Sequence, residues 1–406
     1  MDSKVIVILS DALRHDYPKN HQMKFLEDKI SDQNTDYIEK IVPSIGFCEI
    51  SEYIAGLPVE EHKLLTQITV KGDWASINEE RSLKWLDCLN KIPKRIPIIN
   101  RISNKAVDRL LLQKGIASNT INVRYNIPLS FLPFIRPTES DFEYDQPDFY
   151  QENNFFVWLK QQGINYDIED FVKHNKICGT DYDRFKRLNA KIVNKQLKDF
   201  TLLYIGFGEQ AHFLGTESKK FTEKMQEYSK LLKHTVKLLE QQKNPYQFII
   251  LGDHGMVDVN NYISARPLIN QIEKRNNISL YKDYMYFVDS TMLRVWLNNK
   301  QQIKDVARDI EEYLSPHIEG VSTIQNVLPR FMPTYGDIIC LLKPGNMFYP
   351  DFFNIRKIKA MHGYYNKYPE QSGLLIGIGN NMGTIREKER PLADVQSYLK
   401  NKILGN

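Results

Sequence analysis

Short runs of consecutive apolar residues recur along the chain and predict buried β-strands. The clearest runs cover residues 5–9, 200–207 and 248–251. Residues 373–379 are a further apolar run near the end of the sequence. Apolar runs of this length, without alternating polar positions, are typical of strands in a parallel sheet whose two faces are both covered. The pattern therefore predicts an α/β fold with a mainly parallel central sheet.

The segments between these runs show helical spacing. In the longest, residues 219–242, apolar side chains recur at steps of three and four and form a packing face: Phe221, Met225, Tyr228, Leu232, Val236 and Leu239. Alternation of strands with such segments predicts a sheet that is sandwiched by helices.

The domain organisation follows from length and from local changes of pattern. A chain of 406 residues exceeds the size at which one hydrophobic core usually keeps growing. Residues 71–195 are irregular and rich in aromatic residues and proline, which predicts an insertion or cap. Residues 1–70 and 196–406 would form the core, and residues 280–345 within it a small α+β subdomain.

Charge and composition argue against a nucleic-acid or membrane partner. The 54 Lys and Arg residues nearly balance the 50 Asp and Glu residues, and no basic stripe indicates a nucleic-acid groove. The small excess of +4 favours an anionic small-molecule substrate. No segment reads as a membrane span or signal peptide, and the four cysteines lack paired spacing, so we expect a cytoplasmic protein. The sequence does not indicate an oligomeric state.

Candidate metal ligands follow three of the predicted strands. Asp11 follows the first strand, Glu209 and His212 the second, and the pair Asp253–His254 the third. Because the carboxyl ends of parallel strands meet at one edge, these side chains are expected to converge. Carboxylates beside imidazoles suit zinc. The alternatives are a helix cap for Asp11 and hydrogen-bonded structural pairs for the others.

The segment of residues 43–62 predicts a strand end, a turn and a short helix. A helix that begins near Gly46 would direct free backbone amides towards a phosphate or sulfate. Glu49 is then either a functional carboxylate or the acidic half of a helix cap. Further along the chain, Arg294 is a candidate for binding a substrate anion, or else pairs with a carboxylate of its own subdomain. His362 stands between irregular segments.

Taken together, these motifs resemble the alkaline phosphatase superfamily, in its nucleotide pyrophosphatase/phosphodiesterase-like branch. The resemblance is carried, in order, by residues 7–14, 43–62, 212–215, 252–256 and 362–364. It implies two zinc ions at the carboxyl edge of the sheet, with manganese as the alternative metal. It further implies that one ion is bound by Asp11, Asp253 and His254, and the other by His212 and His362.

The sequence departs from the family pattern at two positions. Gly46 stands where the resemblance places a Thr or Ser nucleophile, and Gly208 stands where it places an aspartate. Glu209, next to Gly208, is the expected replacement for the missing carboxylate. Ser44 is the nearest hydroxyl that can replace the nucleophile, and Glu49 and Ser51 are the other candidates. Gly46 and Phe47 remain candidates for substrate binding.

The predicted function is a metal-dependent hydrolase of a phosphodiester or phosphoanhydride. A bound metal can activate water, so a covalent nucleophile is not strictly required. Two alternatives stay open at this point. One is a catalytically weak or inactive member that binds a ligand or partner, and the other is a transferase of a phosphoryl-linked or sulfuryl group. The sequence does not name the substrate.

Overall fold

The chain folds into two compact units. Unit 1 comprises residues 1–62, 142–258 and 359–406, and unit 2 comprises residues 63–141 and 259–358. A computed structural model describes residues 3–77, 87, 97–122, 126–138, 154–169, 179–323 and 334–405.

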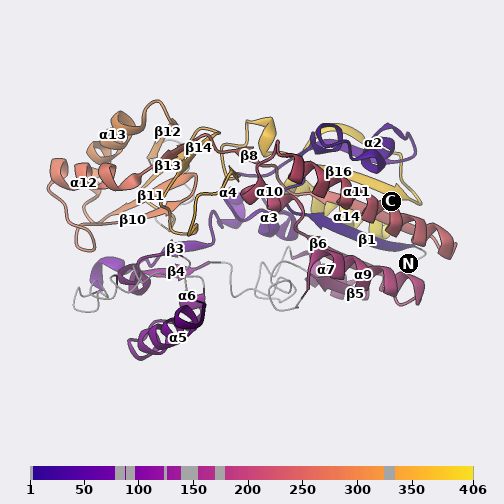
Figure 1. Ribbon diagram of the computed structural model, residues 1–406, viewed down its shortest axis with the longest axis horizontal. Helices are drawn as coiled ribbons and strands as arrows, with labels where there is room; N and C mark the ends of the chain where they lie inside the picture. The colour runs from indigo at the N-terminus through magenta and orange to yellow at the C-terminus, as the bar shows by residue number, and fades with distance from the viewer. Residues whose placement is uncertain are drawn as a thin grey trace. The chain divides into compact units, whose positions relative to one another are not determined.

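Unit 1 is built on a seven-stranded sheet (Figure 1). Its strands lie in the order β17 (Arg386–Pro391), β2 (Asp36–Val42), β16 (Gly373–Gly379), β7 (Tyr246–Gly252), β1 (Lys4–Ser10), β6 (Phe200–Ile205) and β5 (Tyr166–Glu169). Strand β16 is antiparallel to both of its neighbours, whereas the other pairs in the sheet are parallel. The predicted mainly parallel sheet is confirmed.

The register of the three central strands aligns their carboxyl ends. Ser10, the last residue of β1, pairs with Ile205 of β6 on one side and with Gly252 of β7 on the other. The loops that follow these strands therefore leave the sheet at the same level. Side chains a few residues beyond each strand can meet there.

Helices cover both faces of this sheet. On one face, α2 (Lys24–Ser31), α9 (Asp181–Val193) and α11 (Lys219–Gln242) share a core with the strands (Figure 1). The predicted apolar face of α11 is buried in that core. The other face has α3 (Glu49–Ala55), α7 (Phe155–Gln161) and α14 (Val395–Leu404), where α3 contacts both α7 and α14. Short elements complete the unit: α1 (Tyr17–Asn20), α4 (Val59–His62), α10 (Ala211–Leu214), β8 (Val257–Asp258) and β15 (Ala360–Met361).

The unit boundaries differ from the predicted cap of residues 71–195. The described residues from 154 to 195 belong to unit 1, because β5 pairs with β6 and α9 buries Phe185, Leu188 and Ile192 in the main core. Helical spacing in α9 supplies an apolar face, and the sheet provides the surface that this face needs. Of the predicted cap, residues 78–86, 88–96, 123–125, 139–153 and 170–178 lie outside the described residues.

Unit 2 includes residues 280–345, for which the sequence predicts a small α+β subdomain of the core. Its antiparallel sheet has the order β10 (Tyr284–Asp289), β11 (Met292–Leu297), β13 (Ile338–Leu342) and β12 (Ile318–Thr323). Helices α12 (Ala265–Asn276) and α13 (Ile303–Leu314) pack in the core of this sheet. The unit also includes α5 (Pro97–Gln113), α6 (Ser118–Asn122), the pair β3 (Ile68–Val70) and β4 (Ile135–Pro137), and the pair β9 (Asn261–Ile263) and β14 (Asn346–Phe348).

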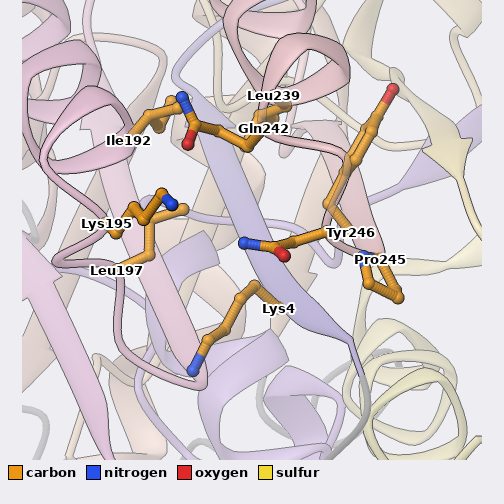
Figure 2. Close-up of a pocket in the computed structure, with 9 residues that line it drawn as sticks. Lys4, Ile192, Lys195, Leu197, Leu239, Gln242, Pro245 and Tyr246 are labelled. Carbon is orange, nitrogen blue, oxygen red and sulfur yellow. The ribbon is translucent and has the colours of Figure 1, made fainter.

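A hollow lies at the amino edge of the main sheet, where Lys4 begins β1 (Figure 2). It is lined by Lys4, Ile192, Lys195, Leu197, Leu239, Gln242, Asn244, Pro245 and Tyr246. The Lys4 ammonium pairs with Asp199 at 2.8 Å. A seven-residue strand is roughly 20 Å long, so this hollow is remote from the carboxyl edge. Its lining offers no carboxylate or imidazole for a metal ion.

Candidate metal centre

The first part of the centre joins the loops after β1 and β7. The Oδ1 atom of Asp11 lies 3.0 Å from Nε2 of His254. The other carboxylate oxygen of Asp11 accepts a hydrogen bond from the Tyr204 hydroxyl. Asp253 Oδ1 accepts from the backbone N–H groups of His254 at 2.9 Å and Ala12 at 3.2 Å. Asp253 thus ties the two loops together.

The second part follows β6, where Glu209 and His212 lie on consecutive short helical turns. Glu209 Oε1 is 3.4 Å from His212 Nε2. His212 Nδ1 donates to the Ala360 carbonyl at 2.7 Å, which leaves Nε2 available as a ligand atom. A Cβ at Gly208 would lie 2.4 Å from the Asp11 carbonyl oxygen. The close backbone approach excludes a side chain at position 208, so the carboxylate comes from the next residue.

The third part comes from the start of α3 and from the segment before β16. Glu49 Oε1 is 3.2 Å from His362 Nδ1. The imidazole rings of His254 and His362 are stacked with centroids 4.0 Å apart, and Phe47 meets His362 edge-on at 5.3 Å. Because β16 runs antiparallel to its neighbours, the segment before it reaches the same edge as the segments after the parallel strands.

These side chains form overlapping sets of potential metal ligands. Among the described residues, three groups of three have ligand atoms within 4.8 Å of one another. The groups are Glu49 with His254 and His362, Glu209 with His212 and His362, and Asp11 with Glu209 and His254. Three imidazoles and three carboxylates are a donor set that zinc or manganese accepts, so the residues present fit a metal ion. Asp253 adjoins these groups without belonging to one.

The electrostatics of the cluster favour a bound cation. Burial raises the pKa of Asp11, and it raises that of Asp253 well above its usual range. Neighbouring negative charges, on Glu209 for Asp11 and on Asp11 and Glu49 for Asp253, raise the two pKa values further. Burial opposes the charged form of His254, but Asp253 and Glu49 hold its pKa well above the usual value. The carboxylates thus stabilise a positive charge in a buried site. A bound metal ion can supply this charge in place of a proton on His254.

Ser44 and Gly46 lie in the loop before α3. The Ser44 hydroxyl donates to Glu52 at 3.0 Å and accepts from the Val59 N–H at 3.2 Å. Its backbone N–H also donates to Glu52, at 2.8 Å. Gly46 has a φ of 113°, a conformation that side-chain-bearing residues rarely adopt. The helix consequently begins at Glu49 and not near Gly46 as predicted.

Arg294 lies in unit 2 and has no exposed surface. Its guanidinium forms a bidentate pair with Asp289, at 2.6 and 3.0 Å, and donates to the Ile68 carbonyl at 2.8 Å. Of the two roles considered for Arg294, the structure shows the pairing with a carboxylate of its own subdomain.

Sequence reasoning missed two residues next to the centre. Tyr204 belongs to a run of apolar residues in β6, where sequence reasoning assigns a tyrosine to the hydrophobic core. Glu52 belongs to a short amphipathic helix and reads as a solvated charge, yet it is only 3% exposed. In both cases the polar group of the side chain bonds to a residue in another segment: the Tyr204 hydroxyl to Asp11, and the Glu52 carboxylate to Ser44. The local sequence pattern does not indicate such contacts.

Comparison with known proteins identifies the family. The family model for type I phosphodiesterase/nucleotide pyrophosphatase matches residues 5–365. The chain belongs to this family. The matched residues include every candidate metal ligand, from Asp11 to His362. The match confirms the predicted membership of the alkaline phosphatase superfamily. Members of the type I phosphodiesterase family are hydrolases of the phosphodiesterase/pyrophosphatase type and typically depend on metal ions.

Solved structures of the type I phosphodiesterase family share the fold. Murine ectonucleotide pyrophosphatase/phosphodiesterase 5 superposes with a TM-score of 0.66 at 13% identity, and the human protein with 0.65 at 13%. An inactive threonine-to-alanine variant of the murine protein, in complex with AMP, superposes with 0.62 at 13% identity. Each match covers 99% of this chain and 95% of the other. In a comparison with curated protein sequences, none matched significantly.

Proposed function

We propose that the protein is a metal-dependent hydrolase of a nucleotide-type phosphodiester or phosphoanhydride. The observation that carries the proposal is the convergence of three overlapping ligand groups at the carboxyl edge of the sheet. Family membership supplies the reaction type. Zinc is the expected metal, at one or two ions per chain, with manganese as the alternative. A bound ion would neutralise negative charge on the phosphoryl oxygens.

We assign some of these residues to metal binding and consider others as the source of the nucleophile. Glu209, His212 and His362 would hold one ion, and Asp11 and His254, supported by Asp253, would hold the other. Gly46 carries no hydroxyl, and the Ser44 hydroxyl is occupied by Glu52 and Val59. We therefore propose that water is the nucleophile.

Glu49 is the proposed general base. Burial opposes its ionisation, but the charges on His254 and His362 lower its pKa, so the carboxylate stays ionised and can accept a proton. As the water oxygen forms its bond to phosphorus, a water proton passes to Glu49 and the bond to the leaving oxygen breaks. The leaving oxygen takes up a proton from solvent, and Glu49 returns its proton to solvent. A phosphodiester thus yields a phosphate monoester and an alcohol, and a phosphoanhydride yields two phosphates.

The experiment compares three variants of the metal-loaded protein on chromogenic phosphodiester and nucleotide esters. Glu49→Gln is expected to lower kcat by about 10² or more, as loss of a general base does, while the metal held by the two ligand groups that do not contain Glu49 is retained. Ser44→Ala should keep most of the activity, as should the matched control Glu61→Gln on the exposed part of α4. Mass spectrometry of quenched reactions should detect no phosphorylated protein.

A second candidate function is a binding protein without turnover. The glycine at position 46 favours it, because the superfamily resemblance places the nucleophilic hydroxyl there. Bound metal with no hydrolysis across nucleotide, sugar-nucleotide and sulfate esters would establish this alternative and reject the hydrolase. A cytoplasmic location, expected from the unpaired spacing of the cysteines in the sequence, is also a proposal. Among the described residues, no helix is both long and apolar enough to cross a membrane.

A further inference from the structure

The two oxygens of the Asp11 carboxylate have different surroundings. One faces the imidazole of His254, within the ligand group that also contains Glu209. The other accepts a hydrogen bond from the hydroxyl of Tyr204. Tyr204 is only 2% exposed, so this hydrogen bond is shielded from water.

Tyr204 is itself held firmly in place. Its backbone pairs with Leu9 in the register of β1 and β6, two residues before Asp11. The Tyr204 carbonyl accepts a hydrogen bond from the guanidinium of Arg184, which also lies over the Tyr204 ring at 5.5 Å from its centroid. Arg184 extends from α9 and is only 1% exposed. The ring therefore has little freedom to move away from Asp11.

We propose that Tyr204 is a positioning residue that orients Asp11 for metal binding. The terminal torsion of an aspartate side chain is broad, so an unsupported carboxylate can rotate. With one oxygen fixed by the Tyr204 hydroxyl, the other oxygen stays directed at the ligand group. Groups that hold a metal ligand from behind in this way typically change metal affinity 10–100-fold when they are removed. The inference rests on the proposed metal centre but not on turnover.

The test measures metal affinity and not activity. Zinc and manganese are titrated into the metal-free full-length protein against a competing chelator. Tyr204→Phe keeps the ring and removes only the hydroxyl, and it is expected to weaken binding about 10- to 100-fold. The melting temperature of the metal-free variant should stay close to that of the wild type.

Tyr228→Phe is the matched control. Its hydroxyl is also buried and bonds to Ser10, the residue before Asp11. Within the described part of the chain, no hydrogen bond joins this hydroxyl to a candidate ligand. This variant should bind metal as the wild type does. Wild-type affinity in Tyr204→Phe, or equal weakening in both variants, would overturn the positioning role and leave the hydrolase proposal standing.

The remaining outcomes separate the two proposals. Metal binding that weakens in Tyr204→Phe, in a protein that hydrolyses nothing, would support the positioning role and reject the hydrolase. A wild-type protein that takes up neither zinc nor manganese would overturn both.

Discussion

The Nε2 atom of His254 lies 3.0 Å from Oδ1 of Asp11, although these residues follow different strands and are far apart in the sequence. The pairing of Ser10 with Gly252 brings their loops to one level. His254 Nδ1 lies 2.8 Å from the Gly255 carbonyl, to which it can donate, and this fixes the ring with Nε2 towards the carboxylates. Strand register therefore determines which atoms a metal ion would meet.

Metal loss should differ between two histidine variants. His254 belongs to two of the ligand groups and His212 to one, so His254→Ala is expected to remove more metal than His212→Ala. Elemental analysis of protein purified without chelator should find one to two ions per wild-type chain. His234→Ala, on the exposed side of α11, is the control and should retain them. Equal losses from the two site variants would contradict this ranking.

Restoring a hydroxyl at position 46 should not restore a family-type nucleophile. At a φ of 113° a threonine is strained, and such strain costs about 1–3 kcal/mol. Gly46→Thr is therefore expected to lower both the melting temperature and the activity. Gly46→Ala carries a similar backbone cost without the hydroxyl and shows how much of the change is strain. A Gly46→Thr variant more active than wild type would indicate a decayed nucleophile position.

The stability of unit 1 should depend on the ionisation of Glu52. Burial raises the pKa of Glu52 from its ordinary 4.5 to about 8 in the folded protein. Between these values the unfolded chain releases the proton and the folded chain keeps it, so the free energy of unfolding falls as pH rises from about 4.5 to about 8. The slope from this group is about 1.4 kcal/mol per pH unit.

Glu52→Gln isolates this effect, because glutamine resembles the protonated acid in shape and charge. Its free energy of unfolding, measured by denaturant titration at several pH values, should lack the Glu52 contribution to the slope. Relative to wild type, the variant should gain stability towards pH 8. Parallel pH profiles of Glu52→Gln and wild type would show that Glu52 ionises normally in the folded protein.

Much of the metal centre could be predicted from the sequence, because its chemistry follows recognisable strand ends. Asp11, Glu209 and His254 each stand just after an apolar run, and the sheet brings them together as expected. Glu209 could be proposed as the substitute for a missing aspartate from its position alone. Only the structure shows that the backbone of Asp11 leaves no room for a side chain at position 208.

Other features could not be predicted, because they depend on contacts between distant segments. The hydroxyl of Tyr204 bonds to Asp11, which follows a neighbouring strand, so its role cannot be inferred from the local sequence. Strand β5 has only four residues with a mixed sequence, and its place at the sheet edge depends on pairing with β6. The sequence predicts a helix that begins near Gly46. In the structure Gly46 has a positive φ, which is not a helical conformation, and the helix begins at Glu49.

The antiparallel strand β16 sets the time at which the centre can form during synthesis. His362 precedes β16, which inserts between β2 and β7, whereas Asp11 follows β1. A nascent chain therefore carries the carboxylate of Asp11 long before the imidazole of His362 has been made. Because such long-range pairing is slow, we expect the proposed metal ion to bind only after His362 has left the ribosome.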